Sequence, residues 1–215
     1  MPSYKLTYFD ARGFAEPARQ LFHLAGVEFE DVRISMENLM PGKKTNEYLE
    51  MVESTPFKKF PVLSVDGFDI PQSSAICRYL AKKFGYAGKT PEEEAWVDAI
   101  VDQFKDFSDS FRVFILAVRA GKPSDEVEKI RKEVFNPARD SYFKILNGIL
   151  EKNGLGFLVG SELSWADLVV ADNLHTLENL KLLEEGHLKL KEYKKNIYDL
   201  DEMKSYIGSR PEREM

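Results

Sequence analysis

The hydrophobic period of the chain changes twice within residues 4–34. Apolar and polar side chains alternate from residue 4 to residue 8, which is typical of a β-strand with one buried face. A helical stripe of apolar residues follows at 14–25, and Gly26 is placed to end that helix. Alternation returns at 32–34 and indicates a second strand. Strand, helix and strand at this spacing predict a βαβ unit with two parallel strands.

A second structured stretch spans residues 57–71 and reads FKKFPVLSVDGFDIP. The dipeptide Asp66-Gly67 between two apolar runs predicts a β-hairpin. Pro61 has no backbone N–H to donate to a ladder, so it should lie at the start or edge of its strand. A cis Phe60-Pro61 bond is one way to hold it there.

Gln72, Ser73 and Ser74 come directly before a helical run that continues to about residue 80. The serines can cap that helix, and its first free amides form a site for an anion. The alternative is a hairpin followed by a helix with no function.

The first 80 residues therefore read β-α-β-α-β-β-α once a weak helix at 46–52 is included. This order predicts an α/β unit over residues 1–82, followed by a glycine-containing connector at 83–90. Residues 91–215 show no strand pattern and predict an all-helical domain.

Two long helices open the predicted helical domain. Between residues 92 and 120, apolar side chains recur at helical spacing beside a polar stripe. Its phenylalanines are typical of a packed core, and a ligand site is the alternative. Ser124 can cap the second helix, which Asn136-Pro137 should kink or break because proline removes a helix hydrogen bond.

A further helix starts at the sequence SWAD, where Ser164 and Asp167 can form a reciprocal capping box. The run that follows at 168–177 is apolar nearly all round, which predicts a helix buried at the centre of the domain. Residues 199–207 indicate one more helix.

Composition excludes several function classes. The 215 residues are 43% hydrophobic and 31% charged, and the net charge of −6 argues against a nucleic-acid partner. No apolar run approaches the roughly 20 residues of a membrane span, and the first residues lack the apolar core of a signal peptide. A single cysteine rules out an intramolecular disulfide and suits a reducing compartment. We therefore expect a cytoplasmic protein that binds neither membrane nor nucleic acid.

Common catalytic motifs are missing from the sequence. The three histidines show no metal-site spacing with cysteines or carboxylates, so we expect no metal. Cys77 lies inside a helical run with no basic residue before it, and we interpret it as a small buried residue rather than a nucleophile. What remains is Tyr8, at the end of the first strand, together with the stretch 57–74.

Three segments resemble, in order, the pattern of glutathione transferases: YKLTYFDARGFAEPAR, FKKFPVLSVDGFDIPQSSAICRYLAKKFG and SWAD. The resemblance covers nearly the whole chain. LTYF together with AWVDAIVDQFKDF resembles the sigma class, which includes many invertebrate enzymes and the haematopoietic prostaglandin D synthases. The resemblance implies a thioredoxin-like glutathione-binding domain followed by a helical domain, in a homodimer, with glutathione as co-substrate and no metal.

The resemblance gives Tyr8 the catalytic role, in which its hydroxyl donates a hydrogen bond to the glutathione sulfur. A free thiol has a pKa of about 8.5, and a hydrogen bond to a charged acceptor contributes roughly 1.5–3 kcal/mol, or about one to two pKa units. The bond would make thiolate a major species at neutral pH, so Tyr8 need not act as a base. A purely structural tyrosine is the alternative.

The resemblance also implies a set of glutathione-binding residues. Phe60, ahead of a cis proline, would offer its backbone to the tripeptide in β-like pairing, and Gln72 with Ser73 would hold the γ-glutamyl carboxylate. Clustered lysines in an acidic domain suit an anionic ligand, with a solvated lysine face as the alternative. The full set is Tyr8, Leu39, Lys43, Lys59, Phe60, Pro61, Gln72, Ser73 and, from the partner subunit, Asp106.

The implied hydrophobic substrate site departs from the sigma pattern. Phe14 stands where that pattern usually has an arginine that polarises the site, and Leu39 replaces a common tryptophan. Thiolate stabilisation should be weaker as a result, while Phe14 enlarges the apolar wall. The set implied for this wall is Phe9, Arg12, Phe14, Phe104, Phe111 and Ile207.

The main hypothesis is a glutathione transferase that conjugates glutathione to small hydrophobic electrophiles in detoxification. One alternative is a glutathione-dependent peroxidase or prostaglandin isomerase. Another is a low-activity carrier of haem or hydrophobic ligands on the same fold. Phe14 and Leu39 favour the carrier, whereas Tyr8, Gln72 and Ser73 argue against it because a carrier needs no glutathione site.

Overall fold

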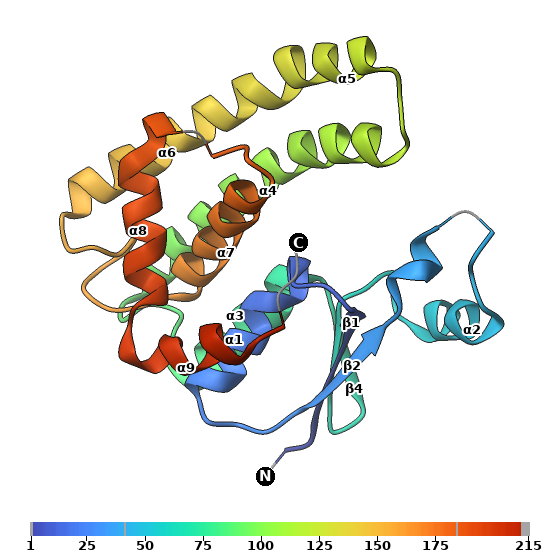
Figure 1. Cartoon of the computed structure of the whole chain (residues 1–215). Coiled ribbons are helices and arrows are strands. Elements are labelled where there is room, and N and C mark those ends of the chain that lie inside the picture. The colour runs from blue at the N-terminus through green and yellow to red at the C-terminus, as the bar shows by residue number, and fades with distance from the viewer. Residues whose placement is uncertain (1, 41, 184, 212–215) are drawn as a thin grey trace.

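The computed structural model describes residues 2–40, 42–183 and 185–211. Figure 1 shows a sheet-containing N-terminal part, coloured blue to teal, beneath a bundle of helices formed by the rest of the chain. This arrangement confirms the predicted fold class, a thioredoxin-like α/β unit followed by helices. The N-terminal elements are β1 (Tyr4–Phe9), α1 (Glu16–Leu24), β2 (Glu30–Ile34), α2 (Asn46–Ser54), β3 (Val62–Val65), β4 (Phe68–Pro71) and α3 (Ser73–Phe84).

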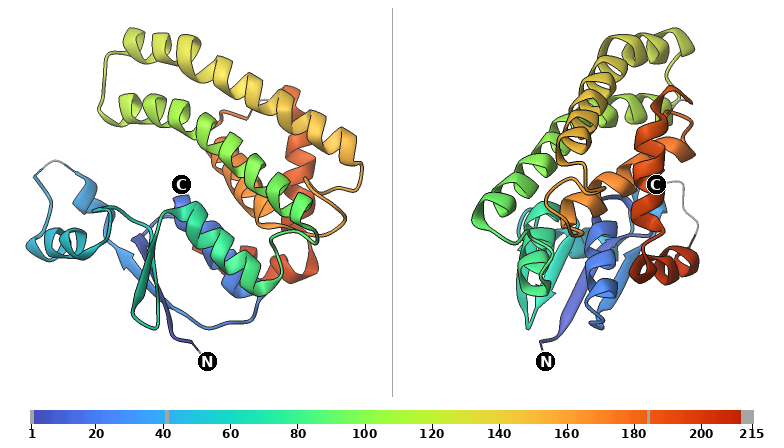
Figure 2. Two further views of the ribbon diagram at one scale, coloured as in Figure 1. Left: turned by 180° about the vertical axis from the view of Figure 1, so that it is seen from behind. Right: turned by 90° about the vertical axis from the view of Figure 1, so that its left-hand side faces the viewer.

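The four strands form one mixed sheet in the order β2-β1-β3-β4. β1 pairs in parallel with β2, as the βαβ pattern predicted, and Tyr8 lies opposite Arg33. β3 is antiparallel to both β1 and β4. Helices α1 and α3 pack side by side, and α1 also packs against the helical part (Figure 2). The sheet therefore holds the end of β1 close to the junction between the two parts.

The predicted hairpin is confirmed. Asp66 has φ of +50° and Gly67 has φ of +85°, the pair of positive values that a tight two-residue turn requires between twisted antiparallel strands. The Phe60-Pro61 peptide bond is cis, as the resemblance to glutathione transferases implies.

The prediction that serines cap α3 is wrong. Gln72 occupies the N-cap position with φ of +74° and makes no side-chain capping bond, and Ser73 is already the first helical residue. The expected cap at Ser124 is wrong for a similar reason, because Pro123 is the N-cap and offers no side-chain acceptor. The first amides of α3 are consequently not used by a side-chain cap.

The helical part contains α4 (Pro91–Arg119), α5 (Ser124–Ile130), α6 (Asn136–Asn153), α7 (Trp165–Asn179), α8 (Leu188–Tyr198) and α9 (Asp201–Ser209). The chain stays helical through Asn136-Pro137, but residues Arg131–Phe135 form a π-helical turn between α5 and α6. Proline lacks the N–H that continues an α-helical ladder, so the predicted interruption takes the form of a change in helix type.

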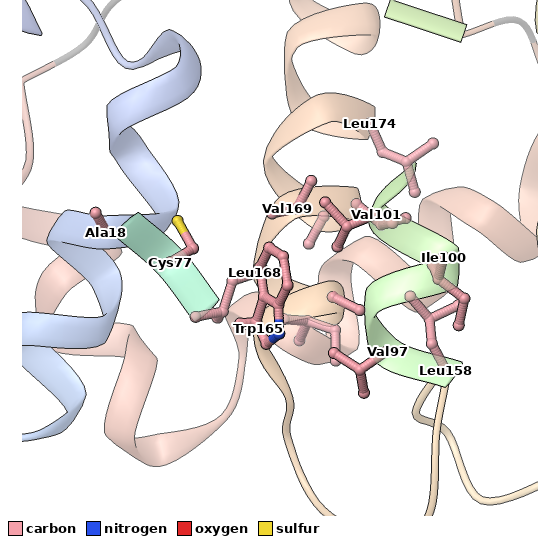
Figure 3. Packing of buried hydrophobic residues seen from close by; sticks show 14 of the residues in the cluster. Ala18, Cys77, Val97, Ile100, Val101, Leu158, Trp165, Leu168, Val169 and Leu174 are labelled. Atoms are coloured by element: carbon pink, nitrogen blue, oxygen red, sulfur yellow. The ribbon is translucent and has the colours of Figure 1, made fainter. Parts of the chain in front are cut away.

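The phenylalanine stripe of α4 is largely core. Phe107 stacks on Tyr142 of α6 with ring centroids 4.7 Å apart, and Phe114 stacks on Phe135 at 5.0 Å. Trp165 is buried in the cluster that joins α4 and α7 (Figure 3). Among the described residues, no helix combines the length and hydropathy needed to cross a bilayer.

The predicted capping box is present at the start of α7. The carboxylate of Asp167 is fully buried and accepts from the amides of Ser164 and Leu158, each at 2.9 Å. It also accepts from the hydroxyls of Ser164 at 2.7 Å and Tyr193 at 2.8 Å. One carboxylate thus ties the start of α7 to the preceding loop and to α8.

We expect Asp167→Ala to lower the free energy of unfolding by at least about 3 kcal/mol, because four donors lose their acceptor inside the core. Urea denaturation near neutral pH measures this loss. The matched control is Asp201→Ala, which removes an exposed carboxylate that pairs with Lys204 at the start of α9 and should cost less than about 1 kcal/mol. Equal losses in the two variants would contradict the central role of Asp167.

His175 on α7 gives the stability of the protein a dependence on pH. Burial lowers the pKa of His175, and the cations Arg12, Arg210 and Lys194 act in the same direction, so that the pKa falls from 6.5 to about 4. Between these two pH values the unfolded chain binds more protons than the folded one, so the folded state loses stability as the pH falls from 6.5 towards 4.

We therefore expect His175→Gln to make thermal stability less sensitive to acid. Melting temperatures of wild type and variant should fall by different amounts between about pH 7 and about pH 4.5, with the larger fall in wild type. Parallel falls in the two proteins would show that His175 keeps an ordinary pKa.

Candidate active site

A cavity of about 270 Å³ lies where the N-terminal part meets α4 and α7. Its walls come from the end of β1 and the turn after it, the start of α3, one face of α4 and one face of α7. Figure 3 shows Cys77 on the α3 side and Val101, Trp165 and Val169 on the side of α4 and α7. The lining residues are Tyr8, Gly13, Phe14, Pro17, Ser73, Ser74, Cys77, Val101, Phe104, Ser108, Phe111, Arg112, Ile115, Leu116, Arg119, Trp165, Val169, Asp172, Asn173 and Thr176.

Tyr8 reaches the cavity from the end of β1. Its hydroxyl oxygen accepts a hydrogen bond from the backbone amide of Phe14 at 3.3 Å. Because that bond uses an oxygen lone pair, the phenolic proton is left for an acceptor in the cavity. Tyr8 is thus arranged as a hydrogen-bond donor.

The protonation state of Tyr8 agrees with this role. Burial raises the pKa of Tyr8 above its ordinary value of 10.0, although the Phe14 amide and the charges of Arg19 and Arg119 oppose the rise. The phenol is therefore neutral at physiological pH, and it keeps the proton that a donor needs.

Gly13 makes room for the Tyr8 hydroxyl. A β-carbon at this position would lie 2.8 Å from the hydroxyl oxygen, closer than carbon and oxygen approach without bonding. Gly13 also has φ of +42°, a conformation that residues with side chains adopt at a cost. The turn between β1 and α1 consequently depends on glycine for both shape and space.

The start of α3 lies on the same cavity as Tyr8, because Ser73 and Ser74 line it. Gln72 directly precedes them, and its side chain is exposed. Phe60 lies beyond the end of the β1–β3 ladder, which stops at Val62, so its backbone is outside the paired part of the sheet. The structure thus brings several predicted glutathione-binding positions near the end of β1.

The remaining predicted glutathione-binding residues lie on the surface. Leu39 is 47% exposed at the end of the 3₁₀ turn Met36–Leu39, and Lys43 and Lys59 are exposed in loops. Asp106 is exposed on α4. None of these four residues lines the cavity, and their roles stay predictions.

The predicted hydrophobic wall divides into two groups. Phe14, Phe104 and Phe111 line the cavity, with the rings of Phe14 and Phe104 6.4 Å apart. Phe9, by contrast, does not line the cavity, and its ring lies 5.5 Å from that of Tyr8 and 6.0 Å from that of Phe60. Ile207 packs against the core from α9 and does not line the cavity.

Arg12, also predicted for the substrate wall, is not among the residues that line the cavity. It is 3% exposed and pairs with Asp172 of α7, with 2.5 Å between Nη1 and Oδ1. Its Nη2 donates to the hydroxyl of Thr176 at 3.0 Å. A charged group with such partners fixes α7 against the N-terminal part and leaves no guanidinium face lining the cavity.

Comparison with protein families identifies both halves of the chain. Residues 4–82 match the glutathione S-transferase N-terminal domain, and residues 105–210 match the glutathione S-transferase C-terminal domain. Glutathione S-transferase 3 of Caenorhabditis elegans is 48% identical over 99% of both chains. The chain belongs to the glutathione S-transferase family.

Solved structures agree with this assignment. A glutathione S-transferase from Caenorhabditis elegans is 54% identical, with a TM-score of 0.86, and the match covers 99% of this chain and all of that one. A Nu-class enzyme of the family from Haemonchus contortus is 43% identical, with a TM-score of 0.86 and full coverage of both chains. This glutathione S-transferase is accordingly a transferase that uses glutathione as co-substrate. The sigma class remains a prediction.

Some residues that line the transferase cavity carry no signal of that role in the sequence motifs. Cys77 is buried as predicted, and burial raises the pKa of its thiol to about 12, yet it also faces the cavity. Asn173 and Thr176 lie on a helix that was expected to be apolar nearly all round. Asn173 and Thr176 are three positions apart, so they lie on one side of the helix. Two polar residues on one side of a buried helix indicate that this side does not pack only against apolar side chains.

We expect Gly13→Ala to lower kcat/KM for glutathione conjugation at least about tenfold, because the new methyl group displaces the Tyr8 hydroxyl. Stopped-time conjugation assays on purified protein measure the change. Gly26→Ala is the matched control, since Gly26 also has positive φ but has nothing within 4 Å of the added β-carbon. Unchanged turnover in Gly13→Ala would contradict the placement of Tyr8.

Proposed function

We propose that this transferase conjugates glutathione to small hydrophobic electrophiles, with Tyr8 stabilising the thiolate. The observation that carries the proposal is the neutral Tyr8 hydroxyl, which accepts from the Phe14 amide and faces a cavity with mostly apolar walls. A neutral donor favours the charged form of a thiol placed beside it. The thiolate is the nucleophile in the reaction, and no described residues cluster in a way that holds a metal ion.

In the proposed reaction with a chloronitrobenzene, the sulfur of glutathione attacks the ring carbon that carries chlorine. The carbon–sulfur bond forms, the carbon–chlorine bond breaks with its electron pair, and chloride leaves. The thiol proton has already passed to solvent, so Tyr8 keeps its own proton throughout. The apolar wall formed by Phe14, Phe104 and Phe111 would hold the aromatic ring.

For glutathione itself we propose a clamp at the N-terminal part. The start of α3 presents backbone amides that no side chain caps, and this end of a twelve-residue helix attracts an anion such as the γ-glutamyl carboxylate. Gln72 and Ser73 stand at that end. Phe60 would pair its backbone with the tripeptide, and Lys43 and Lys59 would attract the glycyl end. Lys58 is less suited, because its ammonium group pairs with Glu53.

A homodimer is part of the proposal, with Asp106 of the partner subunit reaching the amine of glutathione. Large apolar side chains without cover support an interface: Phe68 on the edge strand β4 is 72% exposed, and Trp96 on α4 is 51% exposed. Asp106 lies further along α4 and is exposed. The sigma class and a cytoplasmic location stay predictions.

The second candidate function is a carrier of hydrophobic ligands with little turnover. The largely apolar cavity suits such a ligand, and Phe14 occupies the position at which the sigma pattern has a polarising arginine. Isomerase and peroxidase activities remain alternatives from the sequence alone.

Tyr8→Phe tests the catalytic proposal through the pH dependence of conjugation. Loss of the hydrogen bond should raise the apparent pKa of the glutathione thiol by about one to two units and lower kcat/KM about 10- to 100-fold at about pH 6.5. The two proteins should differ less above the ordinary thiol pKa of about 8.5. Initial rates with a chloronitrobenzene across pH give the profile.

The matched control is Tyr79→Phe, which removes a hydroxyl from α3 on a side chain that does not line the cavity. An unchanged pH profile in Tyr8→Phe would remove Tyr8 from the mechanism. Retention of wild-type protein on immobilised glutathione, with negligible turnover of several electrophiles, would instead support the carrier.

A further inference from the structure

The cavity is graded from an exposed mouth to a buried floor. Phe14 and Leu116 at the mouth are 42% and 55% exposed. Trp165 and Cys77 at the inner end are each 1% exposed, and Val101 is equally buried. Most of the floor is apolar, as expected for a site that removes a hydrophobic substrate from water.

Asn173 interrupts this apolar floor. It is 8% exposed and lines the cavity from α7, and its Oδ1 atom is buried with no hydrogen-bond partner among the described residues. Its polar neighbours on the same helix are engaged, because Asp172 pairs with Arg12 and Thr176 accepts from Arg12. Asn173 is therefore a polar side chain of α7 at the cavity wall whose carboxamide oxygen has no partner among the described residues, as is also true of the indole nitrogen of Trp165.

A second polar side chain faces the same space from the opposite helix. Ser108 on α4 is 9% exposed and also lines the cavity. A carboxamide and a hydroxyl each offer both donors and acceptors, so the pair can donate a hydrogen bond to a neutral ligand oxygen or accept one from a ligand hydroxyl. Buried polar groups are almost always hydrogen-bonded, which points to an occupant that the polypeptide does not supply.

We propose that Asn173 and Ser108 form a polar subsite at the floor of the second-substrate cavity. It selects electrophiles that carry a hydroxyl group at the end remote from the reacting carbon. An apolar chain would run between the floor and the glutathione sulfur near Tyr8. The subsite rests on the proposed conjugation function and adds to it the chemical class of the second substrate.

The experiment compares 2-alkenals with ω-hydroxy-2-alkenals of the same length, in a series of about six to ten carbons. In the reaction the thiolate adds to the β-carbon, the double-bond electrons move to the α-carbon, and the α-carbon takes a proton from water. The terminal hydroxyl is too far from this centre to change its reactivity. The ratio of the two kcat/KM values therefore reports recognition of the hydroxyl.

In wild type we expect the hydroxylated alkenal to be preferred about tenfold at the length that spans the cavity. Asn173→Leu should abolish that preference while conjugation of the plain alkenal continues or improves. Ser108→Ala should weaken the preference. The matched control is Asn147→Leu, because Asn147 also has a buried Oδ1 without a partner but does not line the cavity, and it should leave the ratio unchanged.

Two results would overturn the subsite: no preference at any length in wild type, which would leave Asn173 as a water-binding group, or an unchanged preference in Asn173→Leu. Turnover of the plain alkenal tests the conjugation function separately. Should neither alkenal react, binding of 1-nonanol still tests the subsite, followed by tryptophan fluorescence in a Trp96→Phe background in which Trp165 is the remaining tryptophan. Its dissociation constant should rise about tenfold in Asn173→Leu and stay unchanged in Asn147→Leu, whereas equal values would reject the subsite.

Discussion

The buried ion pair between Arg12 and Asp172 joins the two parts of this transferase. Arg12 follows the strand that carries Tyr8, and Asp172 lies on the central helix α7. Arg210, near the end of the described chain, adds to the pair by binding Glu16 at 2.9 Å and Asp172 at 3.4 Å. Buried charges are tolerated only when paired in this way, so the network fixes α7 and the C-terminal segment in one position against α1.

This constraint matters for catalysis because both parts of the chain contribute residues to the cavity wall. Tyr8 and Gly13 come from the N-terminal part, whereas Phe104, Ser108 and Asn173 come from the helical part. A small shift of α7 relative to β1 would change the distance between the thiolate and the second substrate. The ion pairs hold the wall in place, and the turn at Gly13 holds the hydroxyl that faces it.

The elements themselves were largely predictable from the sequence. Alternation over residues 4–8, the Asp66-Gly67 turn and the capping box at Ser164 each depend on local chemistry, and each is confirmed. The local predictions that failed were the serine caps. Gln72 is the N-cap residue of α3 and has a positive φ, so Ser73 is already inside the helix. The pattern of side chains in the sequence does not predict this backbone conformation.

The sequence by itself determined the order of strands and helices, the family resemblance and Tyr8 as the candidate donor, because these depend on residue spacing along one segment. Only the tertiary structure decided that Arg12 is buried in an ion pair, that Phe9 does not line the cavity and that Asn173 does. Those outcomes depend on which surfaces meet when α4 and α7 pack against the N-terminal part. The contact between Arg12 and Asp172, for example, joins residues 160 positions apart, and hydrophobic periodicity within one segment carries no information about it.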